Sequence, residues 1–146
     1  MTIILVATIL IFIVSIIWTW HNLGFIEKSK KIAFIAIGIL VMYIITSLIF
    51  IVSKSGVNYP NEEIEGTVKN TLVMVFTGLN TLILLPYLAK ILDGILEEEI
   101  EKEEATKKVI IILIVFLICI FIESGYLTDT QKGILNMYSE VQNAKT

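Results

Sequence analysis

Four long apolar runs, separated by short polar segments, constrain this chain more than any other feature of its sequence. Crossing a hydrocarbon core of about 30 Å takes roughly 20 apolar residues in a helix. Each run has about that length, and the mean hydropathy of +0.87 lies outside the range of ordinary soluble domains. The sequence therefore predicts an all-α integral membrane protein with four transmembrane helices, at residues 3–20, 32–52, 71–89 and 109–127.

The turns between the runs predict how the helices pair. Gly24 follows the first run and Gly94 follows the third. Glycine commonly ends helices because it accepts the left-handed backbone conformation. We therefore expect two αα-hairpins, each made of consecutive helices, in a bundle over residues 1–127. A cytoplasmic acidic helical extension over residues 95–108 is expected to run straight into the fourth helix.

The C-terminal residues 128–146 predict a further element. Thr128 and Gln131 have the spacing of a capping box, which marks a helix start. From Ile134 onward, apolar residues recur at i, i+4 and i+7, which places them on one helix face. The tail is expected to form a short extracytoplasmic amphipathic helix, on the membrane surface or against the bundle.

Lysines in the short connections predict the orientation. Seven lysines lie near the first and third connections, against four in the second connection and the tail. Lysine-rich connections face the cytoplasm. The chain is therefore expected to be a multi-pass protein of the cell membrane with both termini extracytoplasmic. Its isoleucine-rich runs and lack of arginine favour a low-GC bacterium as the source.

Charge and residue usage exclude several kinds of function. A net charge of -3 without a dense basic cluster excludes nucleic-acid binding. The single cysteine, Cys119, excludes an internal disulfide and the paired-cysteine chemistry of quinone-linked thiol oxidoreductases. Without arginine the chain lacks the thiol site of glutathione-using membrane enzymes, and its first helix lacks the central glutamate of small multidrug exporters. We therefore expect no catalytic residue, metal ligand or cofactor.

The third run carries the polar residues that lie deepest in the membrane. Asn80 lies at its centre, Thr77 and Thr81 share the same helical face, and Gly78 permits a neighbouring helix to approach. Pro86 removes one backbone hydrogen bond and predicts a kink. These residues either hold helices together or form a polar stripe that lines a pathway. The mostly apolar surroundings favour the first interpretation.

Glu123 is the only charged residue within the fourth run. At 1.5 Å per residue it lies about 22 Å along the helix from Lys108, near the outer boundary. Lys54 follows the second run and Lys69 precedes the third, so both are expected at the same boundary. We expect Glu123 to form an ion pair with one of these lysines. A proton-carrying role is the alternative, because ionisable groups within a span are often functional.

Acidic residues also precede the fourth run. Several are followed by lysine at i+4, as Glu104 is by Lys108, and this order stabilises an exposed helix. A solvated helix face therefore explains the pattern. The alternative is a docking surface for a partner, formed by Glu97, Glu98, Glu101 and Glu104.

These observations favour a small non-catalytic polytopic membrane protein. In this hypothesis it serves as an accessory, assembly or immunity-type subunit, and it lies in the lipid bilayer beside another membrane protein or further copies of itself. The alternative is an oligomeric small-solute transporter or channel, with the pathway lined by Thr77, Asn80 and Thr81. That alternative requires oligomers, because four mostly apolar helices enclose little polar volume.

Overall fold

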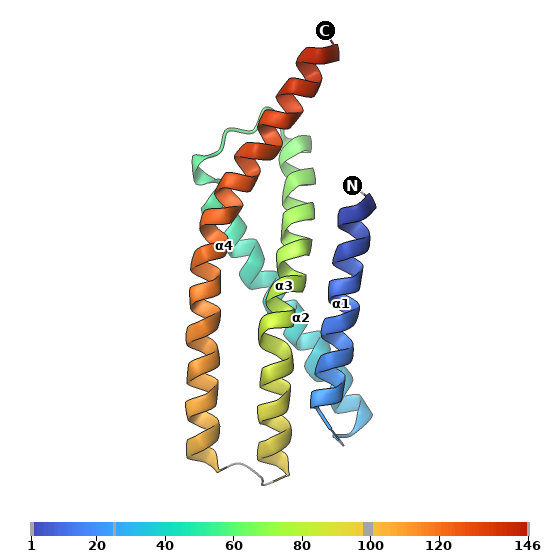
Figure 1. Ribbon diagram of the computed structural model, residues 1–146, viewed down its shortest axis with the longest axis vertical. Helices are drawn as coiled ribbons and strands as arrows, with labels where there is room; N and C mark the ends of the chain where they lie inside the picture. The colour runs from blue at the N-terminus through green and yellow to red at the C-terminus, as the bar shows by residue number, and fades with distance from the viewer. Residues whose placement is uncertain (1, 25, 98–100, 146) are drawn as a thin grey trace.

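A computed structural model describes residues 2–24, 26–97 and 101–145, and the side chains within these ranges except those of 138 and 141–145. Within these ranges the chain forms four helices, all long and apolar enough to cross a membrane. A helix pairs its own backbone groups, as the membrane interior requires. The expected all-α architecture is confirmed. The elements are α1 (Thr2–Asn22), α2 (Lys28–Ser53), the 3-10 helix η1 (Lys54–Gly56), α3 (Glu62–Leu96) and α4 (Lys102–Lys145) (Figure 1).

α3 begins at Glu62, whereas the third apolar run begins only at residue 71. Asn61 caps the helix, because its side chain accepts a hydrogen bond of 2.9 Å from the Ile64 N–H. Acidic side chains in the first turn further favour this start, since they face the positive end of the helix dipole. The polar segment before the third run is therefore largely helical.

The connection between α3 and α4 also differs from the prediction. α3 continues through Gly94 to Leu96, so the expected helix stop at Gly94 is wrong. Gly94 is buried within the helix, and an interior glycine costs a helix only about 1 kcal/mol. The expected extension over 95–108 is divided between the end of α3 and the start of α4, and residues 98–100 lie outside the described residues.

The C-terminal tail is the continuation of α4, a single helix of 44 residues. The separate amphipathic helix expected over 128–146 is therefore not confirmed. This segment contains no proline, and its one glycine, Gly133, is compatible with a helix interior. At 1.5 Å per residue α4 is about 66 Å long, roughly twice the thickness of a hydrocarbon core. Its C-terminal end extends beyond the ends of the other helices (Figure 1).

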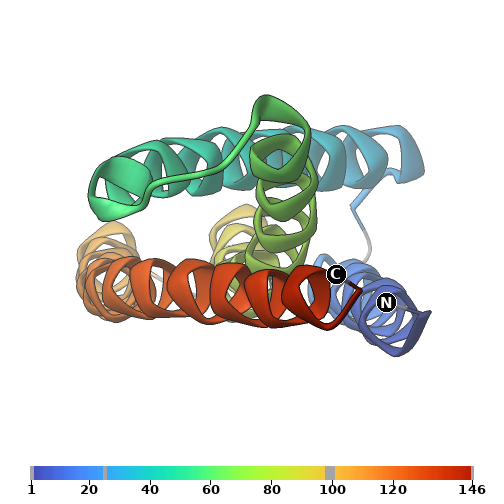
Figure 2. The ribbon, with the colours of Figure 1, turned by 90° about the horizontal axis from the view of Figure 1, so that it is seen from above.

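α3 is the central helix. It packs against α1, α2 and α4, and α1 packs mainly on α3 rather than on its chain neighbour α2. Of the most apolar stretch of α3, 56% is buried, against 17%, 28% and 11% in α1, α2 and α4. α2 crosses the bundle obliquely, as the two perpendicular views show (Figures 1 and 2). The expected pairing of α1 with α2 as an αα-hairpin is therefore not confirmed.

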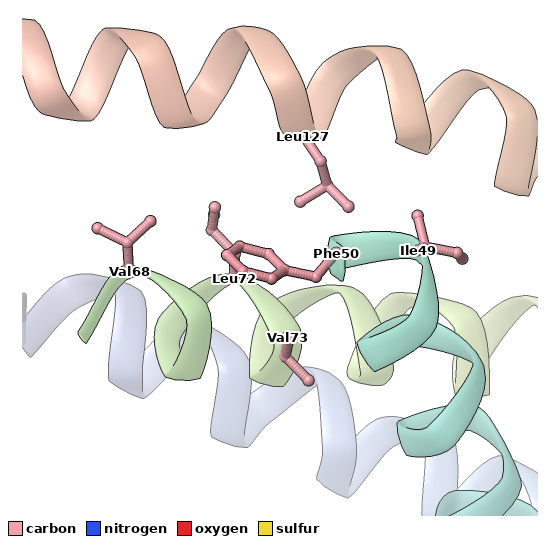
Figure 3. Close-up of a cluster of buried hydrophobic side chains, with 6 residues drawn as sticks. All are labelled: Ile49, Phe50, Val68, Leu72, Val73 and Leu127. Carbon is pink, nitrogen blue, oxygen red and sulfur yellow. The ribbon is translucent and has the colours of Figure 1, made fainter. Parts of the chain in front are cut away.

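Three apolar clusters fill the seam between α2 and α3. Each takes side chains from both helices, α4 closes two of them, and the turn after α1 closes the third. In the largest cluster, Leu127 of α4 points toward Phe50 (Figure 3). The buried members are Leu23, Ile35 and Ala89; Met42, Leu84 and Phe116; and Ile49, Phe50, Val68, Leu72, Val73 and Leu127.

Small residues let the helices approach closely. A Cβ atom on Gly38 of α2 would lie 2.3 Å from Cδ1 of Leu85, so any larger residue here would force the Leu85 side chain to move. α1 approaches α3 at Gly78, where a Cβ atom would lie 3.2 Å from the Phe12 ring.

α1 also carries buried hydroxyl residues, and each donates to the backbone carbonyl four residues earlier. They are Thr8, Ser15 and Thr19.

The turn between α1 and α2 is fastened by side chains from two helices. Gly24 has a φ of 60°, the left-handed conformation expected after the first run. The buried Lys31 ammonium donates a hydrogen bond to the Gly24 carbonyl and lies 4.9 Å from the centre of the Trp20 ring. Asp93 of α3 also lies close to this turn. A Cβ atom built on Gly24 would be only 2.5 Å from Oδ1 of Asp93.

Replacement of Gly38 by alanine tests the close crossing of α2 and α3. We expect Gly38→Ala to lower the free energy of unfolding by about 1–3 kcal/mol, because the buried Leu85 side chain must move. Gly66→Ala is the matched control, since a Cβ atom there meets nothing within 4 Å. Denaturant unfolding in detergent micelles gives both values. Equal stability of the two variants would contradict the close crossing.

Candidate functional site

Polar side chains inside the bundle gather at two levels along α3 and α4. One group, here called the central cluster, lies where α2 and α4 meet the middle of α3. The other, here called the upper network, joins three segments: the end of α2, the loop that precedes α3, and the helix α4. The central cluster consists of Thr46, Thr77, Asn80, Thr81 and Glu123, and the upper network consists of Ser53, Tyr59, Thr128 and Gln131.

Asn80 joins α3 to α2 within the central cluster. Its side chain is fully buried, and its Nδ2 donates a hydrogen bond of 3.0 Å to Oγ1 of Thr46. The Thr46 hydroxyl in turn donates to the backbone carbonyl of Met42 at 2.7 Å. Thr46 is 1% exposed, so this bond lies in the dry interior of the bundle. The Asn80 amide therefore links two helices of one protomer.

The two threonines beside Asn80 are also enclosed by the protomer. Thr81 donates to the backbone carbonyl of Thr77 at 2.7 Å, whereas the Thr77 hydroxyl is buried without a hydrogen-bond partner. Thr77 and Thr81 are 2% and 0% exposed. Pro86 is likewise buried, within an uninterrupted α3. The whole polar face expected on the third helix thus points into the bundle.

Glu123 of α4 completes the central cluster. Its side chain is 8% exposed and lies within hydrogen-bonding reach of the Asn80 side chain. One carboxyl oxygen, Oε2, is buried without a partner, and so is the amide oxygen Oδ1 of Asn80. The central cluster therefore contains two buried acceptor atoms without a hydrogen-bond partner.

The expected ion pair of Glu123 does not form among the described residues. Lys54 instead binds Glu65 of α3, with Nζ and Oε1 2.6 Å apart. Lys69 lines a groove between α1, α2 and α3. The Lys54–Glu65 pair is partly exposed to solvent, so it avoids much of the desolvation cost that a pair at Glu123 would incur.

The upper network holds α4 against the end of α2. Gln131 is fully buried, its Nε2 donates to Oγ of Ser53 at 3.0 Å, and its Oε1 accepts from the Tyr59 hydroxyl. Ser53 donates to the Phe50 carbonyl at 2.9 Å. Thr128 donates to the Ser53 carbonyl at 3.1 Å. The capping-box interpretation of Thr128 and Gln131 is therefore wrong, because both bond across helices from the interior of α4.

Tyr59 lies in the loop before α3, outside the membrane-spanning segments. Burial raises the pKa of Tyr59 to about 12, and the nearby charge of Glu65 adds to the effect. A raised phenol pKa favours the protonated form. The hydroxyl therefore remains a hydrogen-bond donor to Gln131 at neutral pH.

The spacing of residues along α4 is a sequence signal for this arrangement. Side chains of α4 that face α2 and α3 recur every three or four residues and continue without a change of phase past residue 127. This spacing is that of one continuous helix face. The positions are Phe116, Ile120, Glu123, Leu127, Gln131 and Ile134.

Three of the four acidic residues expected to form a docking surface before the fourth run are described, and all three are exposed: Glu97, Glu101 and Glu104. Glu97 caps the end of α3 through its backbone N–H, and Glu101 precedes α4. Glu98 lies outside the described residues. Glu104 and Lys108 form the expected i, i+4 pair, at 3.6 Å and largely exposed. A pair of this kind contributes little to stability.

A double-mutant cycle tests the bond between Asn80 and Thr46. We expect Asn80→Leu and Thr46→Val to show a coupling free energy of about 0.6–2 kcal/mol, the usual size of an interhelical hydrogen bond in a membrane. Ser47→Ala is the control partner, because Ser47 is only partly buried and its hydroxyl bonds the Tyr43 carbonyl of its own helix. Unfolding in detergent supplies the free energies. Additive effects of the first pair would contradict the bond.

The upper network is tested at Gln131. We expect Gln131→Ala to lower the free energy of unfolding by about 1–3 kcal/mol, because Ser53 and Tyr59 lose a buried partner. Lys132→Ala, at the exposed neighbouring position, should change it by less than about 0.5 kcal/mol. Thermal unfolding of the purified protein measures both. A similar small effect at the two positions would show that the network contributes nothing.

Comparison with known proteins gives no family for this arrangement. No protein-family model, curated protein or solved structure matches the chain. Within the described residues, no group of three or more His, Cys, Asp or Glu side chains could hold a metal ion. The geometry of the helices and of their buried polar groups is therefore the basis for a functional conclusion.

Proposed function

We propose that this chain is a non-catalytic, multi-pass membrane protein that serves as an accessory, assembly or immunity-type subunit for another membrane protein. Its termini lie on the extracytoplasmic side, in keeping with the lysine distribution. The observation that carries the proposal is the length of α4, which continues as one helix beyond the bundle.

The end of α4 is a projecting arm, defined here as residues 132–145. It extends about 21 Å beyond Gln131, at 1.5 Å per residue. Gln131 is anchored by the upper network, and Ile134 packs against the apolar cluster below it. The direction of the arm is therefore set by the bundle. Met137, on the arm, is 68% exposed.

A preformed helix that projects from a bundle is well suited to binding another protein. Helices commonly dock in grooves of their partners through one face. A helix that is already formed loses less conformational freedom on binding than a disordered tail does. The arm therefore supports a role in partner recognition, and the four-helix bundle serves as its membrane anchor.

The position of α3 gives less support to the oligomeric pathway. That hypothesis needs Thr77, Asn80 and Thr81 on a surface that faces other protomers. All three are at most 2% exposed within a single chain, because α1, α2 and α4 surround α3. The exposed faces of the other helices are instead rich in large apolar residues, which suit contact with lipid or with an apolar protein surface.

Two substitutions at Gly133 test the arm. Proline removes a backbone hydrogen bond and clashes with the preceding turn, so Gly133→Pro should bend or break the arm. Gly133→Ala is the matched control, because a Cβ atom there meets nothing within 4 Å and alanine favours the helix. Each tagged full-length variant is purified from native membranes in mild detergent, and co-purifying proteins are quantified by mass spectrometry.

We expect one membrane protein to co-purify with the wild type and with Gly133→Ala in a fixed ratio. With Gly133→Pro its recovery should decrease at least about tenfold, which corresponds to a loss of about 1.4 kcal/mol or more of binding free energy. Circular dichroism and thermal unfolding verify that the bundle below the arm stays folded. Equal recovery of the partner with both variants would contradict a role for the arm. A strictly solitary wild-type protein would contradict the proposed function itself.

A further inference from the structure

We propose that Glu123 and Asn80 form a binding site for one monovalent cation, a proton or an alkali metal ion, in the interior of the membrane bundle. This site lies in the central cluster, where buried oxygen atoms remain unpaired, and it is independent of the proposed partner of the arm.

The central cluster has an excess of buried hydrogen-bond acceptors. Oε2 of Glu123 and Oδ1 of Asn80 have no partner, and the hydroxyl of Thr77, one turn earlier on α3, has none either. All three side chains are at least nine-tenths buried. The Nδ2 group of Asn80 carries two N–H donors, and one of them is bonded to Thr46. A bound cation supplies what these oxygens lack, since a proton on the carboxyl donates a hydrogen bond and an alkali ion takes oxygen ligands.

Charge balance points the same way. A buried carboxylate without a neutralising partner is costly in a membrane, and such groups normally pair with a cation. α4 packs against α2, α3 and η1. On α2, residues 32–53 carry no charge, and on α3 residues 70–89 carry none. The protein therefore places no charged side chain opposite Glu123 along these two stretches.

The nearest lysines on these elements are distant or already paired. Lys69 is 11 positions from Asn80, about 16 Å along α3, and Lys54 of η1 binds Glu65. On α4 itself, Asp129 is the next charged residue beyond Glu123 and adds negative charge. The titratable neighbours Cys119 and Tyr126 lie on α4 as well, within one turn of Glu123. A positive charge at the site must therefore come from solution.

The position of the site gives the cation a structural effect. Glu123 belongs to α4, whereas Asn80 belongs to α3 and is bonded to Thr46 of α2. A cation held between Glu123 and Asn80 therefore joins all three helices at one level. Loss of the cation leaves a bare carboxylate between them and weakens the hold on α4.

The test uses the purified full-length protein in neutral detergent. Its thermal unfolding midpoint is measured in sodium, potassium or lithium chloride against choline chloride at equal ionic strength and fixed pH. In parallel, infrared spectra are searched for the C=O band of a protonated carboxylic acid. Glu123→Gln, which replaces the carboxyl by a neutral amide of the same shape, is compared with the control Glu104→Gln at an exposed site. Glu123→Asp serves as a second variant if Glu123→Gln does not fold.

Two outcomes support the site and identify its cation. If an alkali ion is bound, the midpoint rises with that ion relative to choline, and Glu123→Gln but not Glu104→Gln removes the dependence. If a proton is bound, the midpoint is insensitive to alkali ions, and the carboxylic-acid band is lost in Glu123→Gln or shifted in Glu123→Asp. Absence of both the ion dependence and the band would overturn the proposal, because Glu123 would then be a carboxylate without a cation.

Discussion

The close crossing of α2 and α3 is the contact on which the rest of the bundle depends. Gly38 allows the two helices to meet, and the bond between Asn80 and Thr46 joins them where water is absent. Apolar side chains on both sides of this bond fill the seam between α2 and α3. α1 then packs mainly on α3, and α4 packs on both α2 and α3. In a bilayer, where lipid is as apolar as the helices, such close packing and buried hydrogen bonds drive helix association.

The two groups of buried polar side chains differ in how completely they are satisfied. In the upper network, Ser53, Tyr59, Thr128 and Gln131 all take part in hydrogen bonds, so the network fastens α4 without surplus charge. In the central cluster, acceptor atoms of Asn80 and Glu123 remain unpaired. A satisfied network specifies one packing, whereas a buried polar atom left unsatisfied is costly unless a water or an ion partners it. The two levels of α4 are therefore suited to different tasks, anchoring above and ion binding below.

The sequence predicts the number and membrane character of the helices because length and hydropathy alone decide them. It does not predict which helices are neighbours, since that depends on small residues such as Gly38 whose role appears only at a crossing. The predicted local cap at Thr128 and Gln131 is wrong because these side chains bond across helices instead. The expected ion pair between Glu123 and a lysine does not form for a related reason, because Lys54 pairs with Glu65 instead. Residues at the same height on two helices need not face each other.

The central position of α3 also bears on the order in which the protein is made. Synthesis proceeds from the N-terminus, so α1 and α2 enter the bilayer before α3 exists. α1 packs mainly on α3, and buried apolar side chains of α2 also pack against α3. Before α3 exists, the first half of the chain has only the turn fastened by Lys31 and the limited packing of α1 on α2 to hold the two helices together. Most of the helix packing in the bundle can therefore form only once residues 62–96 have been synthesised.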